Sequence, residues 1–425
     1  MILGDARAAE RPARGWGLVL SLALAVAACD TVGGLDAATC AVRTPAAFAP
    51  FAGDVRPSAV PGVRTPGYLH ADGARLVDHR GRTVRLTGVN WFGFETDAFV
   101  PHGLDRRGLG SLLDQVQRLG YNALRVPFAN EMLDPRVHPA AGAIDFDHNP
   151  ELVGLSSLEV LDRLIAEAGQ RGLAVILDRH RAYASEAATE ARGCTKDGPW
   201  YAEGWGEARW VRDWMDLAAR YLGDPTVVGV DLSNEPDGSW GDDVPETDWR
   251  AAAERAGNAI LAVNPELLII VEGVGRHADF PYDHYWTGGN LAGVRSDPVR
   301  LAIPEQLVYS IHDYPASVTD QPWFASAAFP DDLPDVWEAA WGFIARDELA
   351  PILIGEFGSR LESSQDRLWL EHLMDYADEL GASFTVWSLN PDSVDTGGLL
   401  EDDWRTVRRA LQDELAGHLE PSAIR

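Results

Sequence analysis

The sequence predicts an α/β fold, a (β/α)8 TIM barrel in a single domain. From Tyr68 onward, short runs rich in β-branched residues alternate with longer amphipathic runs, and this alternation occurs eight times. Each short run is almost continuously apolar until its last residues. Eight such rounds in about 350 residues match the size of a (β/α)8 barrel. The chain contains no internal repeat that would indicate a solenoid or a propeller.

The expected elements follow one another along the chain. The expected strands are Thr83–Trp91, Asn122–Phe128, Leu173–His180, Val227–Glu235, Leu267–Glu272, Leu307–Tyr314, Pro351–Phe357 and Ser383–Asn390. The expected helices are Gly108–Leu119, Leu158–Gln170, Glu207–Leu222, Trp249–Val263, Val336–Asp347, Arg367–Leu380 and Trp404–Leu415. The fifth round has no clear helix, because residues 275–305 are loop-like. A hairpin formed by Tyr68–His70 and Leu76–Asp78 precedes the first strand, and we expect it to close the bottom of the barrel.

Composition excludes several classes of function. The chain has 36 Lys and Arg against 65 Asp and Glu, a net charge of −29. Such a surface repels phosphate backbones and anionic lipid headgroups, so we expect no nucleic-acid partner and no polybasic membrane contact. Lys196 is the only lysine and lies in a loop-like stretch, which excludes a P-loop lysine and a buried Schiff-base lysine.

The N-terminus predicts export. Arg7, Arg11 and Arg14 precede a 13-residue apolar run, Trp16–Ala28, which is too short to span a bilayer and is typical of a secretory signal. The Val-Ala-Ala-Cys run that ends at Cys29 resembles the lipobox of bacterial lipoproteins. We therefore expect a cell-envelope lipoprotein anchored through an acylated Cys29. An ordinary cleaved signal, which would give a secreted protein, stays open.

The signal segment defines the expected organisation of the chain. Residues 1–29 would be the signal peptide, residues 30–66 a flexible tether rich in Ala, Pro and Thr, residues 67–417 the barrel and residues 418–425 a tail. If Cys29 is acylated, Cys40 and Cys194 remain and could pair in an oxidising exterior, although their spacing does not decide this.

Polar and aromatic residues stand at all eight predicted strand ends. They are Asn90 and Trp91, Arg125, His180, Asn234 and Glu235, Glu272, His312 to Tyr314, Glu356 and Trp387. The active site of a (β/α)8 barrel lies at the carboxyl ends of its strands. We therefore look for the chemistry of this protein in these residues.

Two carboxylates among them, Glu235 and Glu356, are the minimum set for cleavage of a glycosidic bond. One carboxylic acid must protonate the leaving oxygen, and the other carboxylate must attack the sugar centre. Arg125 would keep Glu356 ionised, while burial would keep Glu235 protonated. Tyr314 could donate a hydrogen bond to the nucleophile, and Asn234 lies beside the acid, where it could bind a substrate hydroxyl such as the 2-OH.

Aromatic residues at the strand ends could stack on sugar rings. Trp387 is the first candidate platform, with Trp91 and Trp286 as weaker ones. Most other tryptophans lie at helical positions, where a role in the core is expected.

A metal site is the alternative chemistry for the strand ends. Asp178, His180, His312 and Asp313 could ligate zinc, but metal-dependent barrel hydrolases usually begin with His-x-His on the first strand, where this chain has Val89-Asn90-Trp91. We expect no metal and no cofactor.

The ordered motifs of the chain resemble one family. The segments LTGVNWFGFET, NALRVPF, AVILDRHR, VVGVDLSNEPDG, LVYSIHDYP, PILIGEFGS and VWSLNPDSVDTGGLL are similar to those of glycoside hydrolase family 5, particularly its bacterial endo-β-1,4-glucanases (cellulases). The similarity extends from about Tyr68 to about Leu415.

The resemblance implies roles for the strand-end residues. It implies a retaining mechanism with Glu235 as acid/base and Glu356 as nucleophile, and it places Arg125, His180, Asn234, His312, Tyr314 and Trp387 on the remaining active-site positions. The expected partner is a β-glucan polysaccharide, the chain is expected to be a monomer, and a membrane would be contacted only through an acylated Cys29. The mechanism predicts that the two glutamate carboxyl groups lie about 5–5.5 Å apart.

Departures from the family pattern leave the substrate open. An insertion-like stretch follows Arg181 and continues to Cys194, while Leu389 and Phe128 stand where related enzymes often carry tryptophan and tyrosine. Mannan, xyloglucan, β-1,3-1,4-glucan and a glycolipid glycan therefore remain alternatives. A lipoprotein that binds polysaccharide without cleaving it is a further alternative, which the intact glutamate pair opposes, since two like charges in a buried cleft cost stability.

Overall fold

The computed structural model describes residues 67–185, 199–202 and 204–421. The predicted signal peptide, the acylated Cys29, the tether and both other cysteines lie outside the described residues. None of the helices in the described ranges combines the length and the apolar character that crossing a membrane requires.

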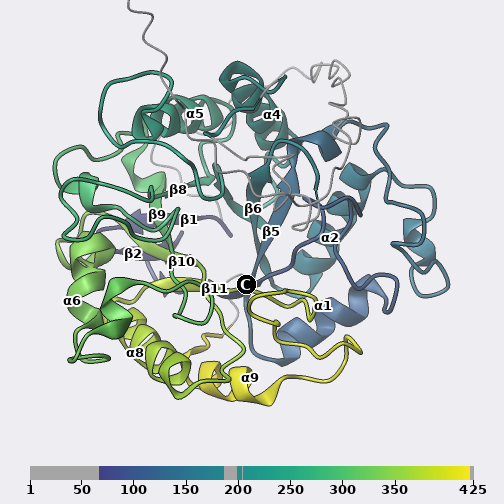
Figure 1. The fold of residues 1–425 in the computed structure, drawn as a ribbon. Coiled ribbons are helices and arrows are strands. Elements are labelled where there is room, and N and C mark those ends of the chain that lie inside the picture. The colour runs from purple at the N-terminus through teal and green to yellow at the C-terminus, as the bar shows by residue number, and fades with distance from the viewer. Residues whose placement is uncertain (1–66, 186–198, 203, 422–425) are drawn as a thin grey trace, which may run out of the picture. The chain divides into compact units, whose positions relative to one another are not determined.

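Eight parallel strands close into a barrel in the order β10-β11-β4-β5-β6-β7-β8-β9, which confirms the predicted fold class (Figure 1). They are β4 (Thr87–Asn90), β5 (Ala123–Ala129), β6 (Ala174–Arg181), β7 (Val227–Asp231), β8 (Leu268–Glu272), β9 (Leu307–His312), β10 (Ile352–Glu356) and β11 (Ser383–Val386). The last strand closes on the first where Phe384 pairs with Thr87. All eight predicted strands are present, but their bounds differ from the prediction. The first is divided, because Thr83–Val84 belongs to a separate small sheet and only Thr87–Asn90 enters the barrel. The strands predicted to end at Glu235 and Asn390 end earlier, at Asp231 and Val386, whereas β5 and β6 each end one residue later than predicted.

Helices surround the barrel, as Figure 1 shows. They are α1 (Leu109–Arg118), α2 (Ser157–Gln170), α4 (Glu207–Arg220), α5 (Trp249–Val263), α6 (Leu333–Trp337), α7 (Phe343–Arg346), α8 (Ser364–Leu380) and α9 (Arg409–Leu415). The prediction for α5 is correct at both ends. The helix begins at Trp249 because the Asp248 side chain caps its first turn by accepting a hydrogen bond from the backbone N–H of Ala251. Between β8 and β9 the described chain forms only two short 3-10 turns, Ala292–Arg295 and Pro304–Gln306, as expected for the fifth round.

Three predicted helices begin several residues away from their expected starts in the structure. The helix expected from Arg367 begins at Ser364, because the Ser363 side chain caps its first turn by accepting a hydrogen bond from the backbone N–H of Asp366. The last helix begins at Arg409 rather than at Trp404, because the Asp403 carboxylate accepts hydrogen bonds from the backbone N–H groups of Arg405 and Thr406 and forms a turn there. The helix expected at Val336–Asp347 begins earlier, at Leu333, and a π-helical turn, Glu338–Gly342, separates α6 from α7.

The barrel is apolar at its bottom and polar at its mouth. A three-stranded sheet of β1 (Leu69–Asp72), β2 (Arg75–Asp78) and β3 (Thr83–Val84) contributes Leu69 and Leu76 to a core inside the barrel, so the expected hairpin closes the bottom. Side chains alternate along each strand, so Ala123 lies in this inner core while Leu124 packs toward the helices. Arg125, the next inward residue of β5, therefore reaches the mouth.

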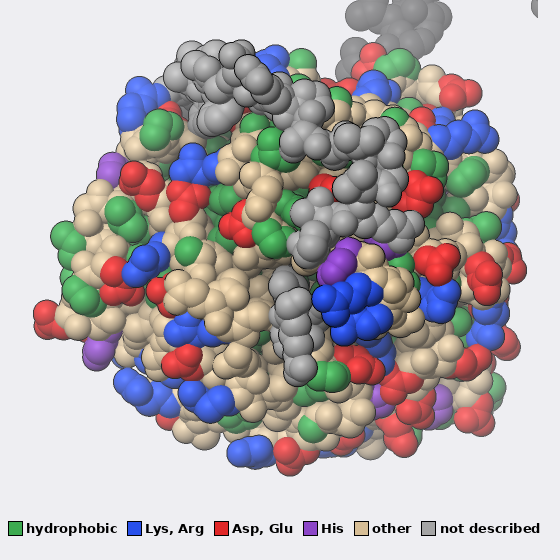
Figure 2. All heavy atoms as spheres, turned by 180° about the vertical axis from the view of Figure 1, so that it is seen from behind, with side chains coloured by type: hydrophobic (Ala, Val, Ile, Leu, Met, Phe, Trp, Pro, Cys, Tyr) green, Lys and Arg blue, Asp and Glu red, His purple; other side chains and the backbone are tan. Residues whose placement is uncertain are grey.

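The surface carries charges of both signs. Figure 2 shows acidic and basic side chains interspersed over one face, and the described side chains there form no continuous basic surface. Over the full sequence, 65 acidic residues exceed 36 basic ones and give a net charge of −29.

Candidate active site

Arg125 is the centre of the barrel mouth, and its side chain is fully buried. Its Nη1 donates to Glu356 Oε1 at 2.7 Å and to Asn90 Oδ1 at 3.0 Å, and its Nη2 donates to Asn234 Oδ1 at 3.1 Å. Three strand ends are therefore tied together by one guanidinium group. The predicted contact between Arg125 and Glu356 is present.

Three further buried carboxylates surround the same guanidinium group. Arg125 Nε donates to Asp231 Oδ2 at 2.9 Å, Nη2 donates to Glu272 Oε1 at 3.0 Å, and Nη2 lies 3.2 Å from Asp178 Oδ2. The oxygens of these three carboxylates lie close enough to one another to ligate a cation. The Arg125 guanidinium already supplies positive charge among them, so a metal ion would have to compete with it.

Glu235 and Glu356 face each other across the mouth. One carboxylate oxygen of each lies within 4.8 Å of the other, together with a ring nitrogen of His312. His312 Nδ1 is 2.9 Å from Glu235 Oε1 and 3.5 Å from Glu356 Oε2. The Tyr314 hydroxyl donates to Glu356 Oε2 at 2.8 Å, so both oxygens of Glu356 are held.

The backbone of Glu235 departs from the strand at this point. Its φ is +41°, in the left-handed region that most residues avoid, and its N–H donates to Glu272 Oε2 at 2.7 Å. Such a conformation costs free energy and is held by its surroundings, here by the Glu272 carboxylate. Glu235 lies four residues beyond the end of β7 at Asp231, and its side chain lines the cleft at the mouth.

The two glutamates titrate in opposite directions. Burial raises the pKa of Glu235, and the negative Glu356 and Glu272 add to this effect, although His312 opposes it. Burial also opposes ionisation of Glu356, but the positive His312, Arg125 and His180 outweigh it and lower the pKa of Glu356. The surroundings therefore favour one protonated and one ionised carboxyl group at the same pH, as the sequence predicted.

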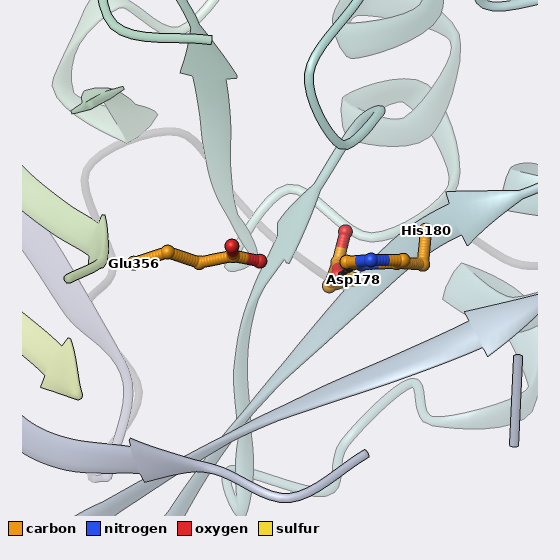
Figure 3. Close-up of side chains that lie close together, drawn as sticks. All are labelled: Asp178, His180 and Glu356. Carbon is orange, nitrogen blue, oxygen red and sulfur yellow. Dashed lines mark hydrogen bonds and ion pairs between the residues drawn. The ribbon is translucent and has the colours of Figure 1, made fainter. Parts of the chain in front are cut away.

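A cleft of about 990 Å³ opens over these residues. Its lining includes Phe92, His180, Asn234, Glu235, His284, Trp286, Tyr314, Glu356 and Trp387. The rings of Phe92 and His180 lie nearly parallel to the Trp387 ring, at 5.3 Å and 5.6 Å between centroids. The Asp178 carboxylate accepts a hydrogen bond from His180 Nδ1 at 2.7 Å. Figure 3 shows these two side chains opposite Glu356.

The family model for cellulases, glycosyl hydrolase family 5, matches residues 77–393. The chain belongs to glycosyl hydrolase family 5. An endoglucanase of Paenibacillus polymyxa is 46% identical over 359 residues, which cover 84% of this chain and 88% of that protein. The major extracellular endoglucanase of Xanthomonas campestris is 39% identical over 345 residues, 79% of this chain and 68% of that protein. The solved structure of a hyperthermophilic endocellulase of Pyrococcus horikoshii has a TM-score of 0.76 at 37% identity and covers 84% of this chain and 99% of that one.

As a member of this family the chain is an O-glycosyl hydrolase of the cellulase type, which confirms the predicted enzyme class. The structure brings nine of the ten candidate site residues to the mouth of the barrel. Arg125, His180, Asn234, Glu235, His312, Tyr314 and Glu356 form the connected polar site, and Trp387 and Trp286 line the cleft above it.

Trp91 is the exception, and its assignment as a sugar platform is wrong. Its side chain is fully buried, and its Nε1 donates to the carbonyl oxygen of His102 at 3.0 Å. Asn90, the last residue of β4, faces the barrel interior, where it contacts Arg125, so Trp91, which follows the strand, faces the helices. Phe92, one residue further on, is the aromatic ring of this segment that lines the cleft.

The sequence interpretation missed part of the family 5 site. Asp231 was not identified, Glu272 had no role, and Asp178 was considered only as a metal ligand. The period of two was a usable signal for Asp178, because it stands two residues before His180 on the same strand. The metal set that included Asp313 does not converge, since Asp313 points away from the mouth and accepts hydrogen bonds from Trp337 and Trp369.

Proposed function

We propose that this family 5 enzyme cleaves internal β-1,4-glucosidic bonds of a β-glucan by double displacement, with retention of the anomeric configuration. The separation of the two glutamates carries the proposal. Carboxyl groups about 5–5.5 Å apart suit a nucleophile and an acid, whereas an inverting enzyme needs about 6.5–9.5 Å to admit a water molecule. Oxygens of Glu235 and Glu356 within 4.8 Å of each other support the retaining arrangement.

In the first step Glu356 attacks the anomeric carbon while Glu235 gives its proton to the glycosidic oxygen. The bond from C1 to that oxygen breaks, the leaving chain departs with a new hydroxyl group, and the sugar is held as an ester of Glu356. The lowered pKa of Glu356 and the raised pKa of Glu235 suit these roles. In the second step the ionised Glu235 takes a proton from water, the water oxygen attacks C1, and Glu356 is released.

The remaining site residues prepare these two steps. Arg125 and Tyr314 hold the two oxygens of Glu356, so the nucleophile is oriented before substrate arrives. His312 lies at hydrogen-bond distance from Glu235 and, when protonated, stabilises it as an anion after proton transfer. Asn234 is placed to bind a hydroxyl group of the sugar that reacts, and Trp387 offers an apolar surface beside it.

The choice of β-1,4-glucan follows the relatives. Two relatives that match most of this chain are named endoglucanases, and a variant of the endocellulase of Pyrococcus horikoshii has been crystallised with cellotetraose. The insertion after Arg181 and the substitutions at Leu389 and Phe128 leave mannan, xyloglucan and glycolipid glycans as alternative substrates. These alternatives share the chemistry and differ in the loops around the cleft.

The test is reducing-sugar release on carboxymethylcellulose, barley β-glucan, glucomannan, xyloglucan and xylan. We expect release from the first two to exceed the others, a rapid fall in viscosity, and a β-anomer as the first product by NMR. Glu356→Gln and Glu235→Gln should each lose nearly all activity. Glu338→Gln should keep it, because this partly exposed glutamate bonds to Arg346 and Tyr376 and does not line the cleft. An α-anomer as first product would overturn the retaining assignment, and binding without release from any glycan would favour the non-catalytic lipoprotein.

We also propose that the barrel is exported and anchored through an acylated Cys29, with residues 30–66 as tether and residues 67–417 as the catalytic domain. The signal-like N-terminus supports export, as does the similarity to a protein named extracellular. Mass spectrometry of the exported protein should find its N-terminus at a diacylglyceryl Cys29. A free N-terminus at another residue would make the enzyme a secreted one.

A further inference from the structure

Asp313 is a buried carboxylate that the proposed mechanism does not use. It stands between His312 and Tyr314, both of which contact the catalytic glutamates. Because side chains alternate at the end of β9, Asp313 faces the surrounding helices, on the side where Tyr309 and Ile311 of the same strand join the apolar core. Its backbone N–H donates to the carbonyl oxygen of Glu356 at 3.1 Å, so this residue also pairs with the strand that carries the nucleophile.

Three side chains from three different segments donate to this one carboxylate. Trp337 of α6 donates to Oδ2 and Trp369 of α8 donates to Oδ1, each through Nε1 at 2.8 Å. The hydroxyl of Tyr285, from the loop after β8, donates to Oδ2 as well. Asp313 is 1% exposed, so no solvent competes with these donors.

Tyr285 extends the network to the wall of the cleft. Trp341 Nε1 donates to the Tyr285 hydroxyl at 3.2 Å, and the Tyr285 ring stacks on Trp323 at 5.5 Å. Its neighbour Trp286 lines the cleft and packs edge-on against the Tyr314 ring at 5.7 Å. A Cβ at Gly289 would lie within 2.7 Å of both the Tyr285 ring and the His312 carbonyl oxygen, so this loop lies directly on the end of β9.

Stability alone does not account for a carboxylate at this position. Burying a charge is costly even when it is hydrogen-bonded, and apolar residues of similar volume often stabilise a fold as well or better. Hydrogen bonds differ from apolar contacts in being directional, so they specify the position of the groups that they join. The hydrogen bonds of Asp313 join the segment between His312 and Tyr314 to α6, to α8 and to the loop that forms one wall of the cleft.

We propose that Asp313 is a positioning residue, which holds the end of β9 so that His312 and Tyr314 meet Glu235 and Glu356, and which holds Trp286 against the cleft. Asp313 touches neither substrate nor reacting atoms. It acts through its two neighbours and through the Tyr285 loop. This inference rests on the proposed roles of the two glutamates.

The experiment compares Asp313→Asn with Asp213→Asn. Asp213 is a matched control, because it is also a buried carboxylate that accepts from an indole, Trp205 Nε1 at 3.0 Å, and from the Asn130 amide, but it lies outside the mouth of the barrel. In Asp313→Asn an amide N–H would face a hydrogen-bond donor, because donors reach both carboxylate oxygens. In Asp213→Asn the amide oxygen can take the place of Oδ2, which accepts from both Trp205 and Asn130, so this variant removes a buried charge and keeps these hydrogen bonds. Asp313→Asn is therefore expected to lower the melting temperature more than Asp213→Asn.

Only Asp313→Asn should change the chemistry. We expect kcat to fall about 100-fold, as for a catalytic group displaced by about 1 Å. We expect the acid limb of kcat/KM to move up by about one pH unit, because Glu356 loses aligned contacts with Tyr314 and His312. Asp213→Asn should leave the acid limb where it is. An unmoved acid limb in a folded Asp313→Asn, or an equal movement in Asp213→Asn, would overturn the inference.

A milder variant covers the case in which Asp313→Asn does not fold. Trp369→Phe removes one donor and leaves the carboxylate with two, so it should move the acid limb in the same direction by less, and no movement would contradict a positioning role. The activity of the wild-type protein on the same substrate tests the proposed function separately from the role of Asp313. If the wild type hydrolyses no β-glycan, the proposed function fails, whereas an active wild type with unaffected Asp313 variants refutes the role of Asp313 alone.

Discussion

Replacing Arg125 by methionine would test how the site keeps Glu356, the proposed nucleophile, ionised. Methionine fills similar apolar volume but removes the charge that four buried carboxylates share, those of Asp178, Asp231, Glu272 and Glu356. Arg125 Nη1 lies 2.7 Å from Glu356 Oε1, within the range at which an opposite charge dominates a carboxyl pKa.

The expected magnitude follows from this contact. An opposite charge within about 4–6 Å lowers a carboxyl pKa by about 1–3 units, so its removal should raise the pKa of Glu356 by that amount. At a pH well below both the old and the new value, the ionised fraction of Glu356 falls about tenfold for each unit of the shift, which corresponds to about 1.4 kcal/mol per unit. The acid limb of kcat/KM should therefore move upward by about 1–3 pH units.

Stability should change as well, and with a defined sign. Removing one partner of a buried ion network costs about 3–5 kcal/mol. Arg125 and its histidine neighbours depress the folded-state pKa of Glu356 and of Asp178, so the stability that they contribute is present above the ordinary carboxyl pKa and is lost as the pH falls through the lowered values. The difference in free energy of unfolding between wild type and Arg125→Met should thus be largest near neutral pH and should shrink in acid.

The assay is kcat/KM on soluble β-glucan from about pH 3 to pH 8, after thermal unfolding has shown that the variants are folded at the assay temperature. Arg107→Met is the matched control, since Arg107 is also buried but bonds to the side chains of Gln115 and Ser111 and to the carbonyl of Trp404. It should lose stability without moving the acid limb. Arg125→Lys should shift the limb less than Arg125→Met, because the charge is kept. An acid limb at the wild-type pH in folded Arg125→Met would refute this account of the nucleophile.

Three further outcomes follow from the structure. The pH profile of kcat/KM should be bell-shaped, rising through the lowered pKa of Glu356 and falling through the raised pKa of Glu235. Glu235→Gln should abolish the basic limb, and a flat single-turnover profile from about pH 4 to 8 would contradict these roles. Trp387→Ala should raise KM for cellotetraose by about two- to tenfold, with a smaller effect on kcat, if its stacking is worth about 0.5–1.5 kcal/mol, whereas Trp91→Phe should leave KM unchanged. Because the protein has a net charge of −29, its melting temperature should rise when the ionic strength increases from about 0.01 to 0.15 M, which shortens the Debye length from about 30 to 8 Å. A constant or lower melting temperature would show that repulsion among the acidic residues is unimportant.

The barrel was predictable because its signals are local. A run of apolar residues that ends in a polar one identifies a strand and its carboxyl end, and the fold then brings all such ends to one mouth. Glu235 and Glu356 are 121 positions apart in the chain and were nevertheless paired correctly. The errors at the helices, such as the start of the last one at Arg409, come from turns in which a single side chain, here Asp403, competes for backbone hydrogen bonds.

Arg125 itself could be predicted as a site residue, but most of the residues that contact it could not. Its contacts come from β4, β6, β7, β8 and β10, and nothing in the sequence around any one of these strands shows which inward residue reaches the guanidinium group. Trp91 is a second residue whose side-chain direction the sequence did not show. Two adjacent aromatic residues, Trp91 and Phe92, look equally suited to line a cleft, and the structure distinguishes them by showing that Asn90 faces the barrel interior, so that Trp91 faces the helices.

The sequence by itself determined the fold class, the strand ends and the two glutamates, because backbone periodicity, burial and residue type are encoded within each βα round. Only the tertiary structure showed which charged groups shift the pKa of each glutamate and which aromatic side chains line the cleft. The opposite pKa shifts of Glu235 and Glu356 depend on distances of a few ångströms between side chains from different strands. Electrostatic energy varies steeply over such distances, and they exist only once the barrel has closed.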